Sequence, residues 1–223
     1  MPSKTVLIIG IDSEIGSNLK KLLLQNGFMV EGTSRKKAIQ SNEVFYFDLK
    51  KPNFELLNKK FDFVIICAAI TNILQCEENR FESKKINVFN TIKLIKNAIK
   101  NSSFVIFLSS NAVFDGAKSF YKYSDVTCPK TKYGEFKNTV EEYIKNNTDE
   151  NACVLRLTKV ISKDTLFIQN WKEDLVKGFY ISAYTNKFIS PVTIEDTILA
   201  LSLIHISEPT RLLSISYAVF CLK

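Results

Sequence analysis

The stretch FVIFLSSNAVFDG spans residues 104–116, and YGEFK follows at residues 133–137. Residues 104–108 are all apolar, which is typical of a strand buried on both faces of a sheet. This strand runs into Ser109 and Ser110, and open α/β sheets bind ligands in the crevice outside the carboxyl ends of their strands. The sequence therefore predicts two hydroxyl groups at the mouth of a binding crevice.

Tyr133 and Lys137 are spaced i, i+4, which places them on one face of a helix. A free tyrosine has a pKa near ~10, and a nearby cation favours its ionised form. We therefore expect Lys137 to lower the pKa of Tyr133, so that the phenol acts as an acid or base near neutral pH while Ser110 hydrogen-bonds the substrate oxygen. The same spacing also occurs on helices by chance, so this catalytic set depends on the strand-end serines and on a nucleotide-binding loop elsewhere in the chain.

Such a loop follows the first apolar segment, residues 5–9. A glycine turn leads here into an amphipathic helix that ends near Gln25, and the free amides and the dipole of a helix N-terminus attract phosphate. The dinucleotide-binding pattern has a third glycine between the other two, where this chain has Ser13. Ser13 either holds the pyrophosphate slightly further away or binds it through its hydroxyl. The predicted phosphate-binding residues are Gly10, Ser13, Glu14, Ile15 and Gly16.

The end of the second predicted strand, residues 28–33, indicates which dinucleotide binds. An acidic residue at this point usually holds the adenosine ribose, but here Ser34 and Arg35 follow the strand. A hydroxyl beside a guanidinium suits a ribose 2′-phosphate, so we predict NADP as the cofactor, with NAD as the second candidate. The alternative interpretation is a solvated basic turn without a role in binding.

Two further strand ends complete the predicted cofactor site. The strand at residues 44–47 ends at Asp48 and Leu49, where the carboxylate either accepts a hydrogen bond from an adenine amino group or forms a turn. The strand at residues 61–67 ends in small residues that let the backbone approach a cofactor. The residues predicted to bind at this second end are Ala68, Ala69 and Thr71.

Apolar strands alternate with amphipathic helices along most of the chain, as far as a sixth strand at residues 152–157. This order predicts an α/β fold, a Rossmann-type doubly wound parallel sheet with a small, truncated C-terminal substrate-binding part. We expect residues 1–160 to form the NAD(P)-binding domain and residues 161–200 to form a partial substrate-binding region.

The chain has 223 residues, a formal charge of +7 and five cysteines. Its basic residues are scattered and form no stripe with interleaved aromatics, so we predict no nucleic-acid partner. No apolar run is long enough to span a membrane, so we expect no membrane partner, and we expect no signal peptide before the first strand. The cysteines have neither metal-ligand nor C-x-x-C spacing, so we expect no metal site and a reducing, cytoplasmic environment.

In the order of these motifs, the chain resembles the extended short-chain dehydrogenase/reductases, and most of all the dTDP-4-dehydrorhamnose reductase type of sugar-nucleotide reductase. The most specific sign of that branch is VFDG at residues 113–116, close after the strand-end serines. Two positions depart from the pattern: Ser13 replaces the middle glycine, and Cys67 stands where an asparagine often precedes the two alanines. The other matching motifs are Gly10 with Gly16, Asp48-Leu49, residues 68–71, Ile86-Asn87, Tyr133 with Lys137, residues 156–158 and Ser190-Pro191.

The resemblance implies that hydride passes from a nicotinamide to a 4-keto sugar attached to a nucleotide. It assigns the catalytic hydroxyl to Ser110, the acid/base role to Tyr133, and the binding of the cofactor ribose to Lys137. A nucleotide-sugar epimerase or dehydratase on the same scaffold is the first alternative, although Asn111 and Ala112 offer no extra acid/base pair of the kind that dehydratases usually need. The second alternative is a non-catalytic NAD(P)-binding regulatory module, and a homodimer is the candidate assembly.

Residues 201–223 resemble the translation of a sequencing adapter. One reading frame of a transposase adapter encodes LSLIHISEPTR, as at residues 201–211, and its continuation after a short index encodes ISYAVFCL, as at residues 215–222. We therefore expect the natural sequence to extend to about Ala200 and the rest to be a non-native read-through tail, which leaves the single histidine, His205, without a role. Because the tail is apolar, we expect it to cover apolar surface as helix or strand.

Overall fold

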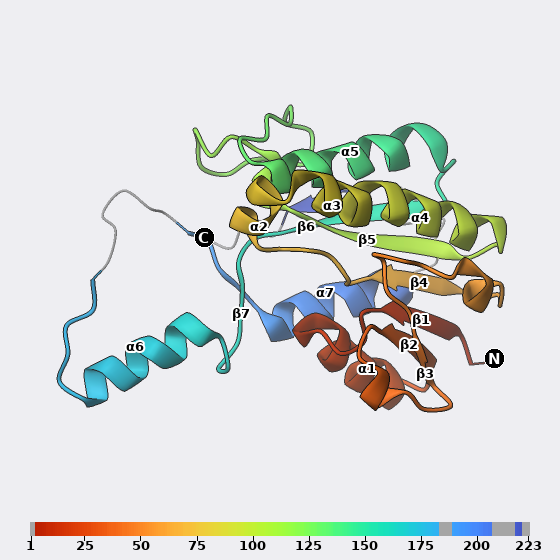
Figure 1. Cartoon of the computed structure of the whole chain (residues 1–223), viewed down its shortest axis with the longest axis horizontal. Helices are drawn as coiled ribbons and strands as arrows, with labels where there is room; N and C mark the ends of the chain where they lie inside the picture. The colour runs from red at the N-terminus through yellow and green to blue at the C-terminus, as the bar shows by residue number, and fades with distance from the viewer. Residues whose placement is uncertain (1–2, 183–188, 207–216, 220–223) are drawn as a thin grey trace.

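A computed structural model describes residues 3–182, 189–206 and 217–219 (Figure 1). At its centre lies a sheet of seven strands in the order β3-β2-β1-β4-β5-β6-β9, and every neighbouring pair in it is parallel. The first six strands have the order 3-2-1-4-5-6 of a doubly wound dinucleotide-binding sheet. The predicted Rossmann-type α/β fold is therefore confirmed.

Short apolar segments form the strands, as expected where a parallel sheet is covered on both faces. The strands of this sheet are β1 (Thr5–Ile9), β2 (Met29–Ser34), β3 (Val44–Tyr46), β4 (Phe63–Ile66), β5 (Phe104–Ser110), β6 (Ala152–Leu157) and β9 (Tyr217–Val219). The helices are α1 (Glu14–Gln25), α2 (Ile73–Glu78), α3 (Arg80–Lys84), α4 (Thr91–Lys100), α5 (Lys132–Asn147), α6 (Leu166–Val176) and α7 (Ile194–Ile206).

Helices cover both faces of the sheet (Figure 1). The alternation of side chains along β1 shows how the two layers divide, because successive residues of a strand point to opposite faces. Ile8 belongs to the apolar cluster that includes α1 and α7, whereas Leu7 and Ile9 belong to the cluster that includes α4 and α5. Residues 6–9 of β1 are thus buried on one face or the other, which explains why all four are apolar.

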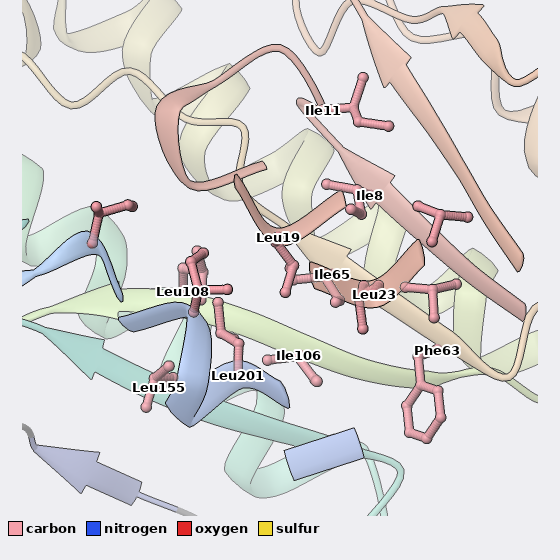
Figure 2. Close-up of a cluster of buried hydrophobic side chains, with 14 of the residues drawn as sticks. Ile8, Ile11, Leu19, Leu23, Phe63, Ile65, Ile106, Leu108, Leu155 and Leu201 are labelled. Atoms are coloured by element: carbon pink, nitrogen blue, oxygen red, sulfur yellow. The ribbon is translucent and has the colours of Figure 1, made fainter. Parts of the chain in front are cut away.

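The layer between the sheet and helices α1 and α7 is shown in Figure 2. Leu19 and Leu23 of α1 and Leu201 of α7 pack in one cluster with strand residues such as Ile65 and Ile106. All five side chains are fully buried. Burial of one such side chain contributes about 1.5–3 kcal/mol relative to leaving it exposed. This packing fixes the position of α1, whose first turn belongs to the predicted phosphate loop.

The strand register brings the functional strand ends to the same edge of the sheet. Ile9 at the end of β1 lies opposite Ile66 at the end of β4, and Ile66 lies opposite Phe107 of β5. Further along β5, Ser110 lies opposite Leu157 at the end of β6. The loops that follow β1, β4 and β5 therefore leave the sheet side by side, as the predicted site requires.

The C-terminal part adds a separate two-stranded sheet of β7 (Val160–Ile161) and β8 (Val192–Thr193). Helix α6 extends away from the main sheet (Figure 1), and none of its residues is buried. The expected boundary near Ala200 falls inside α7, and β9 pairs with β6, so residues 201–206 and 217–219 of the tail form helix and strand against the rest of the chain. Residues 207–216 and 220–223, which include Cys221, lie outside the described part. No helix within the described part is both long and apolar enough to cross a membrane.

We expect Ile65→Ala to lower the free energy of unfolding by about 2–5 kcal/mol, because it leaves a cavity in the fully buried centre of β4. Met29→Ala is the matched control: its side chain is 55% exposed, so a change of less than about 0.5 kcal/mol is expected. Urea denaturation at pH 7 measures both. Equal losses in the two variants would contradict the two-layer core.

Candidate active site

The loop between β1 and α1 contains the residues predicted to bind a phosphate. Gly10 has a positive φ of 86°, and a Cβ at this residue would lie 3.0 Å from Ala68. A Cβ at Gly16 would lie 2.4 Å from the carbonyl oxygen of Gly10. Only glycine fits either place, so the loop packs tightly against the end of β4. The amides of Glu14 and Ile15, in the first turn of α1, have no intrahelical acceptor and are available to an anion.

Ser13 replaces a glycine without strain, because its φ of −71° is ordinary for any residue. Its hydroxyl accepts a hydrogen bond from the amide of Gly16 at 3.0 Å and donates one to the carbonyl of Gly10 at 2.7 Å. Ser13 is therefore the N-cap of α1, a position where serine is strongly preferred. Both hydrogen bonds of the hydroxyl are thus made within the loop. This favours the interpretation that Ser13 holds the pyrophosphate slightly further away over the interpretation that its hydroxyl binds the pyrophosphate directly.

The end of β2 carries the predicted ribose-binding residues. Ser34 is buried, and its hydroxyl accepts a hydrogen bond from the amide of Lys36 at 3.0 Å. Asp12 of the phosphate loop forms an ion pair with Lys36 at 3.1 Å. Burial, which raises the pKa of Asp12, is outweighed by hydrogen bonds from Lys36 and Ser34, so the net pKa of this carboxyl is lowered. Arg35 is exposed at the same edge, and within the described ranges no ion pair is found for it.

Asp48 and Leu49 follow β3, and both are engaged within the protein. The Asp48 carboxylate accepts a hydrogen bond from the amide of Lys50 at 2.8 Å, which is the turn-forming role. Leu49 is buried in the core, and its carbonyl accepts a hydrogen bond from the side chain of Asn90 at 2.6 Å. The predicted contact of Asp48 with adenine stays a prediction.

The segment after β4 is held in place by Asn87. This residue lies in a π-helical turn at residues 85–90, between α3 and α4, and π-helical turns are frequent at functional sites. Its side chain accepts a hydrogen bond from the amide of Ile70 and donates one to the carbonyl of the same residue, each at 2.8 Å. Asn87 thus clamps the loop that carries Ala68, Ala69 and Thr71.

Helix α5 brings Tyr133 and Lys137 to the end of β5. Its N-cap, Thr131, accepts a hydrogen bond from the amide of Gly134 at 3.1 Å. A Cβ at Gly134 would lie 2.1 Å from the carbonyl oxygen of Ala112, so the start of α5 touches the turn that follows Ser110. The absence of a side chain at Gly134 therefore allows the phenol and the serine to come together.

Lys137 is a buried cation that donates to a backbone carbonyl. Its Nζ donates a hydrogen bond to the carbonyl of Leu108 at 2.7 Å and lies 4.6 Å from the centre of the Phe107 ring. Burial lowers the pKa of Lys137 to about 8, although Glu141 one turn further along α5 opposes this shift. The ammonium group therefore stands at the end of β5, between the strand and Tyr133, 5.8 Å from the centre of the tyrosine ring.

The expected lowering of the pKa of Tyr133 is wrong for this structure. Burial raises the pKa of Tyr133 to about 12, although a hydrogen bond with Ser110 opposes the shift. The nearby ammonium group does not reverse it, because Lys137 is itself desolvated and is directed at the Leu108 carbonyl. Tyr133 is consequently protonated at neutral pH, which suits a proton donor.

An open cleft of about 1300 Å³ runs along these strand ends. Ser110, Tyr133 and Lys137 all line it, so the structure brings the three predicted catalytic residues together. Of the predicted cofactor residues, Ile15, Ala69 and Thr71 also line the cleft. The others surround the same edge of the sheet outside this lining: Gly10, Ser13, Glu14, Gly16, Ser34, Arg35, Asp48, Leu49 and Ala68. In the described part, no group of three His, Cys, Asp or Glu side chains could hold a metal ion.

Two features escaped the sequence analysis. Asp12 reaches the end of β2 from the phosphate loop, and the ion pair of Arg156 with Glu141 is buried beneath the cleft. Each pair joins residues that are distant in the sequence, so no spacing rule indicates it. The only signal for Glu141 was its position, i+4 from Lys137 on the same helix face.

We expect the difference in the free energy of unfolding between the wild type and Lys137→Met to shift in favour of the wild type as the pH increases from 8 to 9.5. The pKa of Lys137 is about 8 in the folded state and ~10.4 in the unfolded chain, so the unfolded state binds more protons in this window and stability increases with pH. The window ends below pH 10, where Tyr133 starts to contribute with the opposite sign. Lys145→Met, on an exposed part of α5, is the control. Parallel curves for the wild type and Lys137→Met would contradict the lowered pKa.

The chain is similar in sequence to known proteins of two kinds. Over 170 residues, the chain is 27% identical to methionine adenosyltransferase 2 subunit beta of Bos taurus, covering 70% of this chain and 47% of that protein. Over 137 residues, it is 31% identical to the dTDP-4-dehydrorhamnose reductase of Aggregatibacter actinomycetemcomitans, covering 59% of this chain and 44% of that protein. The chain therefore spans less than half the length of either relative.

Solved structures share the fold at low sequence identity. A dTDP-4-dehydrorhamnose reductase from Bacillus anthracis, crystallised in complex with NADP, superimposes with a TM-score of 0.79 at 20% identity, covering 93% of this chain and 72% of that one. The sequence also matches the family described as RmlD substrate binding domain over residues 4–194, which is most of the chain. The resemblance inferred from the motifs is thus confirmed at the level of the family: the chain belongs to the RmlD substrate binding domain family of extended short-chain dehydrogenase/reductases.

Proposed function

We propose that this protein is an NADP-dependent reductase of a nucleotide-linked 4-keto sugar. The observation that carries the proposal is the convergence of Ser110, a protonated Tyr133 and a buried Lys137 on one wall of the cleft, at the end of β5. The similarity to a dTDP-4-dehydrorhamnose reductase supports the substrate class.

The residues of the site suit a dinucleotide. Gly10 and Gly16 allow the tight turn between β1 and α1, because a side chain at either position would collide with the protein itself. The N-terminus of α1, which this turn leads into, favours the negative charge of a pyrophosphate. Arg35 and Ser34, at the end of β2, would hold a ribose 2′-phosphate, and Lys137 would hold the nicotinamide ribose. When bound, the nicotinamide supplies the hydride.

The side chains of this chain supply the proton and the orientation. Ser110 hydrogen-bonds the keto oxygen, which places that oxygen beside the phenol of Tyr133. As negative charge develops on the oxygen during reduction, Tyr133 transfers its proton to it. The Lys137 ammonium group, 5.8 Å from the centre of the Tyr133 ring, attracts the tyrosinate that remains and offsets part of the cost of its burial. The high pKa of Tyr133 before the reaction keeps the donor protonated.

An epimerase or dehydratase is the closest enzymatic alternative. The position after Ser110 carries Asn111, and Ala112 follows it; neither side chain is an acid or a base. This observation disfavours dehydration, which needs a further acid/base pair near the strand end.

A regulatory role is the second candidate, and one observation favours it. Several relatives at 27–29% identity are named methionine adenosyltransferase 2 subunit beta, so a similar chain occurs as the subunit of another enzyme. A module of this kind would bind a dinucleotide and a partner without needing Tyr133 as a proton donor. Turnover by the wild type separates the two functions, because only the reductase consumes NADPH.

We expect Tyr133→Phe to lower the rate of NADPH-dependent reduction of a dTDP-linked 4-keto sugar by a factor of about 10²–10⁴, because the variant lacks the proton donor. The affinity for NADPH, followed by its fluorescence, should stay within about twofold of the wild-type value, since the phenyl ring is retained. Tyr143→Phe, on the same helix against the core, is the control. NADPH binding without turnover in the wild type would favour the regulatory module.

We expect Arg35→Ala to weaken NADPH binding at least about tenfold and to leave NADH binding within about twofold, because only the 2′-phosphate offers the guanidinium a charged partner. Lys37→Ala, on the same exposed turn, is the matched control for general loss of positive charge. Fluorescence titration with both nucleotides measures the effect. Equal weakening of NADPH and NADH would show that Arg35 does not select the phosphate.

A further inference from the structure

Residues 114–125, which we call the wall loop, form one side of the cleft. The cleft lining includes every residue from Phe114 to Tyr121. The loop contains no regular helix or strand, yet its amides are hydrogen-bonded internally: Ala117 donates to the Asp115 carboxylate at 3.0 Å, and Lys122 donates to the Asp125 carboxylate at 2.7 Å. Such a loop has a defined shape, but these bonds do not place it relative to the catalytic helix.

Arg156 of β6 connects the wall loop to α5. Its guanidinium is buried, with 5% of the side chain exposed, and it forms a forked ion pair with Glu141 of α5 through Nε at 3.1 Å and Nη2 at 2.6 Å. Its remaining nitrogen, Nη1, donates to the carbonyl of Tyr123 at 3.1 Å. One side chain therefore joins the sheet, the catalytic helix and the wall loop.

A stack of rings makes the second connection. The Arg156 guanidinium carbon lies 5.0 Å from the centre of the Phe114 ring, within the range of a cation–π contact. Phe114 in turn stacks on Tyr121, with ring centres 4.3 Å apart and planes 11° from parallel. The Tyr121 hydroxyl donates to the Asp115 carboxylate. Both ends of the wall loop are thus tied to the same guanidinium.

Between these two ties, the loop presents an apolar ring to the cleft. Phe120 lines the cleft, is 68% exposed and has a positive φ of 58°. A positive φ is uncommon for a bulky residue and persists only where the surrounding structure imposes it. An exposed ring held in this way offers a flat apolar surface to the sugar or the base of a nucleotide-linked substrate.

We propose that Arg156 is a positioning residue for the substrate side of the cleft: it ties the wall loop to α5 through Glu141, Tyr123 and Phe114, and so sets where Phe120 stands relative to Tyr133. The part that concerns the substrate rests on the proposed reductase function. The part that concerns the loop rests on the contacts alone. Arg156 and Glu141 touch neither the substrate nor the reacting atoms in this scheme.

The test compares Arg156→Lys, Phe114→Leu and Phe120→Ala with the wild type. Lysine keeps the charge opposite Glu141 but lacks the planar fork that also reaches Tyr123, because guanidinium and ammonium differ in geometry. Phe114→Leu removes the ring that contacts the guanidinium and leaves the buried ion pair of Arg156 with Glu141 intact. It therefore tests the connection to the wall loop even if Arg156→Lys fails to fold. Phe120→Ala removes only the presented ring.

Hydrogen exchange of backbone amides is the first measurement. We expect the amides of Ala117, Lys122 and Asp125 to exchange at least about tenfold faster in Arg156→Lys and in Phe114→Leu, with amides of β5 within about twofold of the wild type. Phe120→Ala should leave all these rates unchanged. Unchanged exchange of the wall-loop amides in both Arg156→Lys and Phe114→Leu would overturn the proposal. Exchange that accelerates equally in β5 would also overturn it, because Arg156 would then contribute to the stability of the whole protein and not to the position of the loop.

Steady-state kinetics with NADPH and a dTDP-linked 4-keto sugar are the second measurement. We expect all three variants to raise KM for the sugar about tenfold with kcat within about threefold, because the affected contacts bind the substrate without entering the chemical step. A fall in kcat at constant KM would overturn the substrate part of the proposal. If the wild type reduces no such sugar, the proposed function fails, whereas the exchange measurement still decides whether Arg156 holds the wall loop.

Discussion

The hydrogen bond from the Lys137 ammonium group to the Leu108 carbonyl joins α5 to the central strand β5. A buried charge is costly unless it is hydrogen-bonded, so the position of Lys137 leaves little freedom in how α5 lies on β5. The contact of Gly134 with the carbonyl of Ala112 imposes the same closeness one turn earlier. Together, these two constraints place Tyr133 beside Ser110.

The same closeness explains the electrostatics of the site. Packing α5 against the strand end removes water from both Tyr133 and Lys137, so burial is the leading cause of each pKa shift. The shifts oppose ionisation of both groups, since burial disfavours the charged form of an acid and of a base alike. Glu141 limits the effect on Lys137, and its own charge is matched by Arg156. A chain of charges therefore runs along one face of α5, from the catalytic end to the buried ion pair.

The two halves of the cleft are built by different means. On the cofactor side, glycines at close approaches and the start of α1 expose backbone amides, and side chains such as Ser13 serve the loop itself. On the opposite side, an irregular loop depends on side-chain contacts with Arg156. The first arrangement suits a constant ligand, whereas the second can vary with the substrate because loops tolerate change better than packed turns do.

The sequence by itself determined the order of strands and helices, and it predicted both the glycine loop for a phosphate and the candidate catalytic set of Ser110, Tyr133 and Lys137. These features are local, because apolar runs, glycine turns and the i, i+4 spacing are set by neighbours in the chain. Only the tertiary structure decided the direction of the Tyr133 pKa shift, the pairing of Asp12 with Lys36 and the burial of Arg156 against Glu141. The physical reason is that desolvation and ion pairing depend on which distant segments pack together, and no local pattern encodes that distance.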